Sequence, residues 1–443
     1  MRSRVYNMTK YAIIVFMILP YTILHAQEPD VEAIRPELEA KAMTFFQVVT
    51  GTHKTESLSD IEMTDAMQKW VQSGSATRDV TKIIERDYGG GEWRKNEYLE
   101  HGDNVRSVEL CYSGTKQSFK IRVSFAGKQI IGLHTLPWVD EQIHYGMPIS
   151  LETPTGTLFG SLVEPEQIAT QAVPVLLIVA GSGPTDRNGN NNQGLLCNSY
   201  LLLAKALQEN GIASVRYDKR GVGASVEAAG TDEAKWRFED LVDDVRRWID
   251  LLSKEAKYSK IIIAGHSEGS LMGMIACSQS GQAGGLISLC GAGRPIDEVA
   301  LEQLLRQSKS VHDSMRSIFD ELKQGKTVDN VPQVLQGLAR PSVQPYMISW
   351  LKYDPRVEIK KLSIPVMIVQ GTTDIQISLV DADNLAEANP QAQKTIIKNM
   401  DHTLKNNPAR NTLLPLATYT DPRFPLHEEL MSGIVQFILG IEQ

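Results

Sequence analysis

Cysteine is scarce in this chain of 443 residues: there are four, at Cys111, Cys197, Cys277 and Cys290, and no Cys-x-x-Cys pair. So few cysteines exclude a fold built on disulfides, and their spacing gives no sign of a zinc site or a redox dithiol. Cys277 and Cys290 stand in apolar stretches, so we expect both to behave as small core residues.

Basic residues are also fewer than acidic ones. There are 45 lysines and arginines against 53 aspartates and glutamates, which gives a net charge of −8. Phosphate binding needs a concentrated basic surface, and no long block of Lys and Arg is present. Nucleic acid is therefore excluded as the expected partner.

Long hydrophobic runs are missing except near the N-terminus. Residues 11–24 are almost wholly apolar and follow a positively charged start (Arg2, Arg4 and Lys10). This run is short for a membrane span, which needs about 20 residues, and Leu24-His25-Ala26 fits a cleavage site. We expect residues 1–26 to be a signal peptide and the mature chain to be periplasmic or secreted, without membrane contact. An uncleaved anchor is the alternative.

What is present suits a large folded core, since 42% of the residues are hydrophobic and 22% charged. Residues 27–140 begin with two or three helical stretches, and Gly89-Gly90-Gly91 ends them. Runs with a period of two follow, typical of an antiparallel sheet with one buried face. The expected helices are 31–49, 58–71 and 77–88, and the expected strands are 106–113, 117–125 and 129–136. This small α+β domain resembles nuclear-transport-factor-like domains, and its scattered histidines suggest no catalytic site.

Residues 141–443 follow a different pattern, in which short apolar runs alternate with helical stretches. Near-continuous apolar strands separated by helices predict a mostly parallel sheet covered on both faces. The expected strands are 175–180, 213–217, 260–264, 285–289, 366–369 and 395–397, and the expected helices are 199–209, 236–253 and 270–278. The helical stretch 295–350 is too long for an ordinary connection, so we expect a cap inserted over the sheet.

The strongest motif is Gly265-His266-Ser267-Glu268-Gly269, which directly follows a predicted strand and precedes an apolar helix. This Gly-x-Ser-x-Gly sequence in a strand–turn–helix context is typical of a nucleophile elbow. Its glycines allow a strained turn that raises the serine into the cleft. Ser267 is therefore the candidate nucleophile, and we assign no catalytic role to His266.

A serine hydroxyl needs a general base, and the base needs an acid that orients it. Asp374 follows the predicted strand 366–369, and His402 follows the predicted strand 395–397, so both belong at the sheet edge that carries Ser267. We expect His402 to be the base and Asp374 the acid, with Asp381 and Asp401 as alternatives.

The tetrahedral intermediate of acyl transfer carries a negative oxygen that backbone N–H groups must stabilise. One donor comes from the residue after the nucleophile, Glu268. The second should follow strand 175–180, in Gly181-Ser182-Gly183-Pro184, and we expect the Ser182 N–H, with Gly183 as the alternative.

Two further loops are expected to be structural. Asp186 and Arg187 should fix their loop through local hydrogen bonds. The stretch 217–225, Tyr-Asp-Lys-Arg-Gly-Val-Gly-Ala-Ser, has two glycines but lacks the third glycine and the immediate helix of a nucleotide-binding loop.

With these motifs in order, residues 145–441 resemble an α/β-hydrolase, in particular the bacterial serine carboxylesterases that carry Gly-Ser-Gly-Pro-x-Asp-Arg-x-Gly and Gly-His-Ser-x-Gly. The resemblance implies an α/β-hydrolase fold and cleavage of a small-molecule carboxyl ester through an acyl-enzyme on Ser267, without a metal or organic cofactor. Because the expected cap, residues 295–350, is of modest size, we expect acyl groups of short to medium length. A serine peptidase and an acyltransferase use the same triad and remain alternatives, and a non-enzymatic binding module is less favoured. The N-terminal domain should supply no catalytic residue; it would limit access to the cleft or mediate pairing into a homodimer, or only stabilise the chain.

Overall fold

The structure is a computed structural model that describes residues 31–102, 105–115, 118–137, 145–191, 194–408 and 417–442. The predicted signal peptide, residues 1–26, lies outside these ranges. The described residues form two compact units, one before residue 138 and one from residue 145. None of the helices in these ranges combines the length and apolar character needed to cross a membrane.

The first unit consists of helices followed by a four-stranded antiparallel sheet in the order β1-β2-β3-β4. Its apolar core lies between the helices and one face of the sheet, where Phe45, Leu110 and Ile121 are fully buried. The elements are α1 (Val31–Val49), α2 (Asp65–Gln72), α3 (Ser75–Ile83), a π-helix (Ile84–Tyr88), β1 (Glu92–Gly102), β2 (Val105–Ser113), β3 (Phe119–Ala126) and β4 (Gln129–Pro137).

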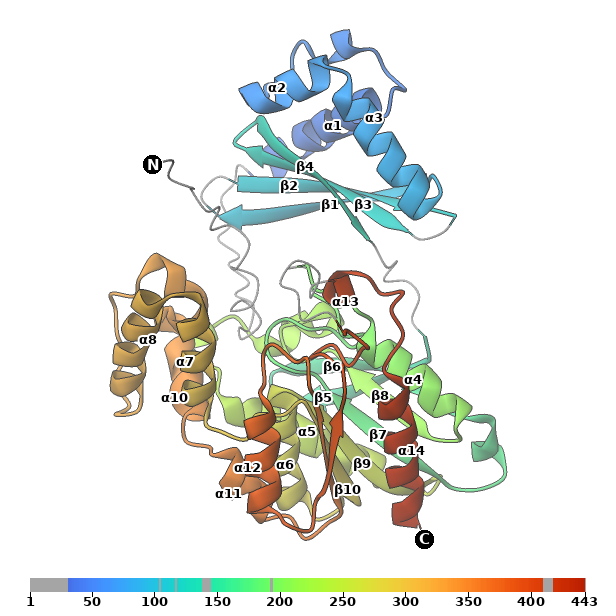
Figure 1. Cartoon of the computed structure of the whole chain (residues 1–443), viewed down its shortest axis with the longest axis vertical. Helices are drawn as coiled ribbons and strands as arrows, with labels where there is room; N and C mark the ends of the chain where they lie inside the picture. Colours follow the sequence, from blue (N-terminus) through green and yellow to red (C-terminus); the bar gives the residue numbers. More distant parts are fainter. Residues whose placement is uncertain are drawn as a thin grey trace. The chain divides into compact units, whose positions relative to one another are not determined.

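The second unit is built on an eight-stranded sheet in the order β12-β11-β10-β9-β7-β8-β6-β5. Strands β5 to β10 of this sheet are labelled in Figure 1. Six neighbouring strands, from β12 to β8, run parallel, and β6 and β5 continue the sheet antiparallel. The strands are β5 (Met147–Thr153), β6 (Gly156–Val163), β7 (Val173–Val179), β8 (Ala213–Tyr217), β9 (Tyr258–His266), β10 (Gly285–Leu289), β11 (Val366–Gly371) and β12 (Gln393–Ile397).

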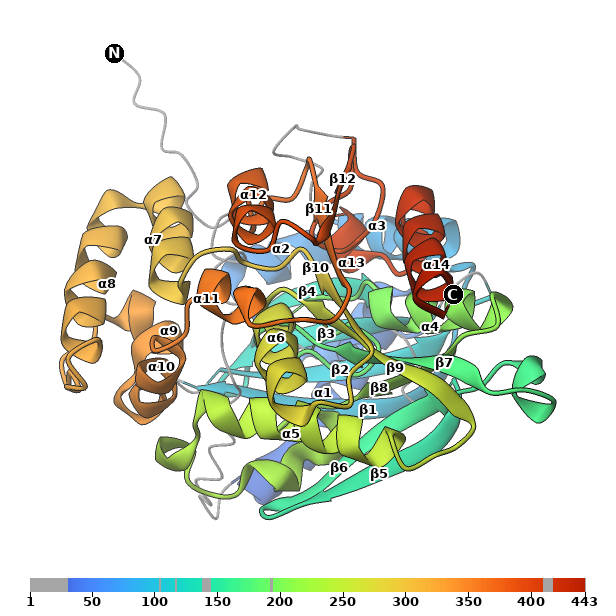
Figure 2. The same ribbon diagram turned by 90° about the horizontal axis from the view of Figure 1, so that it is seen from below.

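Helices cover both faces of this sheet (Figure 2). In β7, Val175 and Leu177 pack into a core with the helices of one face, whereas Leu176 and Ile178 pack into the core of the other. Both sets are buried, which explains why the strands read as continuous apolar runs. One face carries α5 (Phe238–Leu252), α6 (Glu268–Ser280), α11 (Pro355–Lys360) and α12 (Leu379–Ala388), and the other carries α4 (Ser199–Glu209) and α14 (Glu428–Glu442).

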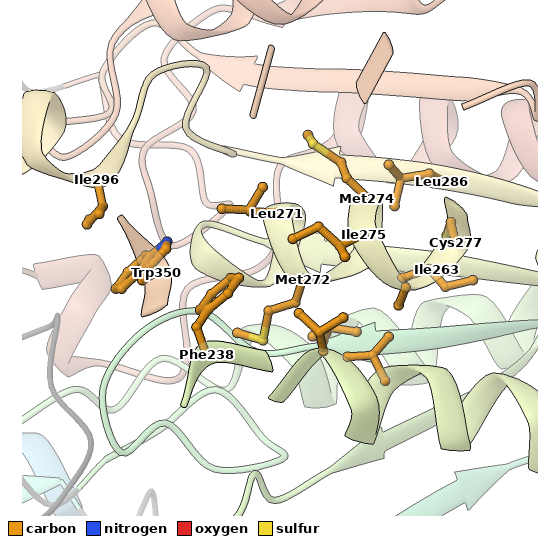
Figure 3. Packing of buried hydrophobic residues seen from close by; sticks show 14 of the residues in the cluster. Phe238, Ile263, Leu271, Met272, Met274, Ile275, Cys277, Leu286, Ile296 and Trp350 are labelled. Atoms are coloured by element: carbon orange, nitrogen blue, oxygen red, sulfur yellow. The ribbon is translucent and has the colours of Figure 1, made fainter. Parts of the chain in front are cut away.

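A helical segment separates β10 from β11, as expected for residues 295–350. It contains α7 (Ile296–Gln307), α8 (Lys309–Leu322), α9 (Gln336–Ala339) and α10 (Gln344–Trp350). Trp350 stacks on Phe238 of α5 at 5.4 Å between ring centroids, with Leu271 and Ile296 close by in Figure 3. The cap is thus anchored to the sheet domain through a shared apolar core.

The predicted fold class is confirmed: a mostly parallel α/β-hydrolase sheet with a helical cap insertion follows a small α+β domain.

The structure corrects several element predictions. Strand β1 was not predicted, because its residues are mostly polar on both faces and show no alternation. The antiparallel pair of β5 and β6 was not predicted either. The helix expected over 58–71 begins only at Asp65, after the Thr64 side chain caps it, and the helix expected over 77–88 changes to a π-helix after Ile83.

Candidate active site

The order of the strands creates a crevice at one edge of the sheet. After β7 the chain adds β8 on one side and then β9 on the other, so the loops that follow β7 and β9 separate in opposite directions. In open parallel sheets such a switch point at the carboxyl ends of the strands is where ligands bind. The loop at 180–183 and the elbow at Ser267 meet at this point.

Ser267 occupies a strained turn between β9 and α6, with φ 54° and ψ −120°. The flanking glycines allow this turn because a side chain at either position would collide with backbone. A Cβ on Gly265 would lie 2.2 Å from the Gly269 carbonyl oxygen, and one on Gly269 would lie 2.4 Å from that of Val179. The Gly-x-Ser-x-Gly spacing is therefore a packing requirement of the elbow.

The structure brings the predicted acid and base into contact. Nδ1 of His402 lies 2.8 Å from Oδ2 of Asp374, and both side chains are buried. Their loops approach closely where β11 ends, since a Cβ on Gly371 would lie 2.0 Å from the Met400 carbonyl oxygen. A carboxylate at Nδ1 favours the tautomer whose Nε2 is free to accept a proton.

The Asp374 carboxylate is built to stay ionised. Burial alone would raise its pKa, but the charge and hydrogen bond of His402 and the amides of Ile377 and Gln376 outweigh burial, so the pKa is lowered. Oδ1 accepts from the amides of Gln376 (2.7 Å) and Ile377 (3.0 Å), and Oδ2 also accepts from Gln370 Nε2 at 3.0 Å.

The two alternative acids are engaged elsewhere. Asp381 accepts hydrogen bonds from the Arg294 side chain and the Gly293 amide, and it caps the start of α12. Asp401 accepts from Thr403 and Asn407 within its own loop region. Among the residues described, only Asp374 is hydrogen-bonded to the His402 ring.

Ser267 and His402 line one pocket, but no hydrogen bond joins them in the residues that the structure describes. Catalytic hydrogen bonds are often long without substrate and tighten when it binds.

The loop that follows β7 and the nucleophile elbow together form the expected oxyanion site. A Cβ on Gly181 would lie 3.1 Å from that of Ser267, so the loop after β7 lies directly beside the nucleophile. Within the described ranges, the amides of Ser182 and Glu268 have no hydrogen-bond acceptor in the protein, and Glu268 opens helix α6. Both predicted donors are thus available to an anionic oxygen.

His266 stabilises the site through contacts of both of its ring nitrogens. Its Nδ1 lies 2.8 Å from the Tyr200 hydroxyl and its Nε2 lies 2.9 Å from the His402 carbonyl oxygen. Burial, aided by the nearby His402, lowers the pKa of His266 to about 3, so it stays neutral. This matches the packing role expected from the sequence.

His266, Cys290 and His402 are the one group among the described residues whose ligand atoms lie close enough to hold a metal ion. Both ring nitrogens of His266 are already engaged, and Nδ1 of His402 faces Asp374. Burial keeps the pKa of the Cys290 thiol well above its usual value. The donor set therefore does not suit a metal, which needs deprotonated thiolate and free ring nitrogens.

Two pockets flank Ser267. The first contains about 420 Å³ of empty space, part of it open to solvent, and is lined by His402 and by polar and aromatic residues that include Thr185, Thr403 and Tyr419. The second contains about 510 Å³ of empty space, part of it open to solvent. Apolar residues of α6 and the cap line it (Leu271, Ile296, Val299 and Trp350), together with polar residues that include Arg294 and Gln303. A substrate bound at Ser267 can therefore extend into both pockets.

The two loops expected to be structural are held by hydrogen bonds, but only those of Asp186 are local, because Arg187 reaches across to the other loop. Asp186 Oδ1 accepts from the amides of Asn188 and Asn190, and Arg187 pairs with Asp218 at 2.6 Å. Sequence reasoning missed Gln370, which contacts Asp374, and Lys219, whose ammonium group reaches the Gly181 carbonyl oxygen. Gln370 could have been suspected as a polar residue in an apolar strand, but nothing near Lys219 in sequence reveals its contact.

One family of known proteins matches part of the chain. The family described as Serine aminopeptidase, S33 (Hydrolase_4) matches residues 194–409, a little under half of the chain. A search of curated proteins finds no match.

Solved structures similar to the chain include Est1E from Butyrivibrio proteoclasticus with ferulic acid bound (16% identity, TM-score 0.44, covering 66% of this chain and 99% of that one). They also include a proline iminopeptidase from Mycobacterium smegmatis (14%, 0.43, 67% and 99%) and an esterase from Pyrococcus furiosus (12%, 0.44, 69% and 95%).

The features that support a serine hydrolase site are found in this chain itself. They are the order of the parallel strands, the elbow after β9, and the sequence order of serine, aspartate and histidine at three strand ends. The chain has the α/β-hydrolase fold, and the family match together with this site supports a serine hydrolase.

Proposed function

We propose that the protein hydrolyses carboxyl esters of short to medium acyl groups through an acyl-enzyme on Ser267. Ser267 Oγ attacks the carbonyl carbon while His402 Nε2 takes its proton, and the amides of Ser182 and Glu268 hold the resulting oxyanion. The C–O bond to the alcohol then breaks, and His402 returns the proton to the leaving oxygen. Water, deprotonated by His402, cleaves the acyl-enzyme and restores the serine.

The observation that carries this proposal is the division of the cleft at Ser267. His402 must protonate the leaving oxygen, so the alcohol belongs in the pocket that His402 lines. The acyl group then enters the apolar pocket under the cap, where Trp350 and Val299 line the wall. The apolar lining of this pocket comes from a small number of side chains, which favours a short or medium acyl chain over a long one.

An aminopeptidase is the second candidate, because the matching family carries that description. Holding a substrate's free α-ammonium group requires a carboxylate in the cleft. Among the described residues that line the two pockets, Glu268 is the one acidic side chain. Its carboxylate already accepts from the Tyr346 hydroxyl and faces Lys219 at 3.8 Å. This supports an ester over a peptide substrate.

The test compares p-nitrophenyl esters from acetate to palmitate with aminoacyl-p-nitroanilides at equal concentrations. We expect kcat/KM to be highest for an ester of short or medium chain and to fall toward palmitate. Turnover of the anilides above that of the esters would contradict the proposal and favour a peptidase. Adding an alcohol and measuring the ratio of transferred to hydrolysed acyl groups distinguishes an acyltransferase, for which transfer would exceed hydrolysis.

We also propose that the chain is exported, on the basis of its charged start and the apolar residues 11–24. N-terminal sequencing of the protein recovered from the periplasm or medium of an expressing bacterium should find Gln27 first. Recovery only from the cytoplasm or membrane, with Met1 retained, would contradict this.

A further inference from the structure

The peptide unit that joins Gly181 to Ser182 is held at its carbonyl oxygen, and the preceding peptide unit is held at the Gly181 N–H. The Gly181 carbonyl oxygen accepts a hydrogen bond from Lys219 Nζ, and the Gly181 amide donates to the Tyr200 hydroxyl at 3.2 Å. In a trans peptide the carbonyl and the next N–H point in opposite directions. A contact that fixes the Gly181 carbonyl therefore also fixes the direction of the Ser182 N–H.

Lys219 is an unusual residue to find at this position, because it is 5% exposed. Its ammonium group lies 3.8 Å from Oε2 of Glu268, which is 7% exposed, and Oε1 of Glu268 accepts from the hydroxyl of Tyr346 in the cap helix α10. Burial lowers the pKa of Lys219 and raises that of Glu268. A buried pair of this kind adds little stability compared with apolar residues of similar volume, so its place beside the site calls for another explanation.

We propose that Lys219 is a positioning residue that keeps the Ser182 N–H directed at the oxyanion, and that Glu268 and Tyr346 hold Lys219 in place. This inference rests on the proposed role of Ser182 as an oxyanion donor. Gly181 has no Cβ, so its peptide unit can rotate more freely than that of another residue. A rotated peptide would turn a carbonyl oxygen toward the anion and repel it.

The same network joins the two halves of the oxyanion site. Glu268 supplies the other donor N–H from its own backbone while its side chain faces Lys219. Tyr346 brings the cap into this network, since it is the cap residue that contacts the Glu268 carboxylate. A cationic donor on the Gly181 carbonyl also polarises the peptide and strengthens its N–H as a donor.

The test replaces Lys219 with methionine, which has a similar length and no charge. We expect kcat on p-nitrophenyl acetate to fall about 100- to 1000-fold, as for loss of one oxyanion donor, with little change in KM. The rate at which a fluorophosphonate modifies Ser267 should fall in parallel, because its phosphoryl oxygen uses the same donors. Affinity for a ground-state ligand such as the product alcohol should stay within threefold of wild type.

Arg220→Met is the matched control, since Arg220 is the next residue, is also buried and pairs with Asp244 at 2.6 Å away from Gly181. It should lower the Tm and leave the phosphonylation rate of the folded protein unchanged. Glu268→Gln keeps the backbone N–H and the acceptor for Tyr346 but removes the charge that faces Lys219, and should slow phosphonylation about tenfold.

A folded Lys219→Met variant that reacts with the phosphonate within threefold of the wild-type rate would overturn the inference. If that variant does not fold, Glu268→Gln decides: a wild-type rate overturns the inference, and a slower rate with unchanged ground-state affinity supports it. Failure of the proposed function would look different. The wild type would then react with the phosphonate but hydrolyse no ester, and the comparison of variants would still stand.

Discussion

Replacing Asp374 with asparagine exchanges one carboxylate oxygen for an NH2 group, and the structure determines which one. Oδ1 accepts from two backbone amides, those of Gln376 and Ile377. An NH2 group there would face two donors, so the asparagine oxygen has to stay on that side. The NH2 group then takes the place of Oδ2, against His402 Nδ1 and the Gln370 amide.

An NH2 group at this position donates to Nδ1 and forces the proton of the His402 ring onto Nε2. Nε2 can then no longer accept the Ser267 proton, and the positive charge that develops on the ring loses its carboxylate partner. We expect kcat for ester hydrolysis to fall about ten-thousand-fold, the size of effect seen when a triad acid is replaced in this way. KM should change little, because Asp374 does not line either pocket.

The assay measures kcat and KM on p-nitrophenyl acetate together with the Tm of each variant. Asp401→Asn and Asp381→Asn are the controls, since both acids are buried and hydrogen-bonded away from the His402 ring. They should lower the Tm and keep kcat within about tenfold of wild type. A nearly wild-type Asp374→Asn variant, with one of the other two inactive, would transfer the role of the acid and refute the reasoning.

Three further predictions follow from the packing and electrostatics of the site. Gly265→Ala should abolish activity and lower the Tm, because its Cβ would meet backbone at 2.2 Å, whereas Gly440→Ala, which meets nothing within 4 Å, should be neutral or slightly stabilising; equal Tm values would contradict this. His266 has a pKa of about 3 when folded and an ordinary value of 6.5, so only the unfolded chain binds this proton between these values. Stability should therefore fall as pH drops below 6.5, by up to about 1.4 kcal/mol per pH unit from this group, and urea unfolding of His266→Gln should show a shallower dependence. Trp350→Leu should enlarge the apolar pocket and shift the preferred ester toward longer acyl chains, and an unchanged chain-length profile would place the acyl group elsewhere.

The parallel core of the fold could be predicted from sequence because burial on both faces leaves uninterrupted apolar runs. The helix Ser199–Glu209 and the strands Ala213–Tyr217 and Gly285–Leu289 have the predicted bounds. Strand β1 could not be found this way, since its exposed, charged residues belong to the edge of a sheet and carry no pattern of burial.

The residues of the site that belong to a short sequence motif, or that follow a predicted strand, could be predicted. Backbone contacts explain both glycines beside Ser267, and the strand ends place Asp374 and His402. The contact between Lys219 and Gly181 could not be predicted, because the two residues meet only after the sheet has formed. The contact between Tyr346 and Glu268 could not be predicted either. The two residues are 78 positions apart in the sequence, and other aromatic residues, such as Trp350, lie near Tyr346 in the cap.

The most direct test of the account is the reaction of Ser267 itself. The wild type and Ser267→Ala are treated with a fluorophosphonate probe, the modified peptide is identified by mass spectrometry, and turnover of p-nitrophenyl acetate is measured on the same samples. We expect labelling at Ser267 in the wild type. In the Ser267→Ala variant, with an unchanged circular dichroism spectrum, we expect neither labelling nor turnover above background. A folded Ser267→Ala variant that is still labelled, or that still turns over the ester at the wild-type rate, would show that the nucleophile lies elsewhere.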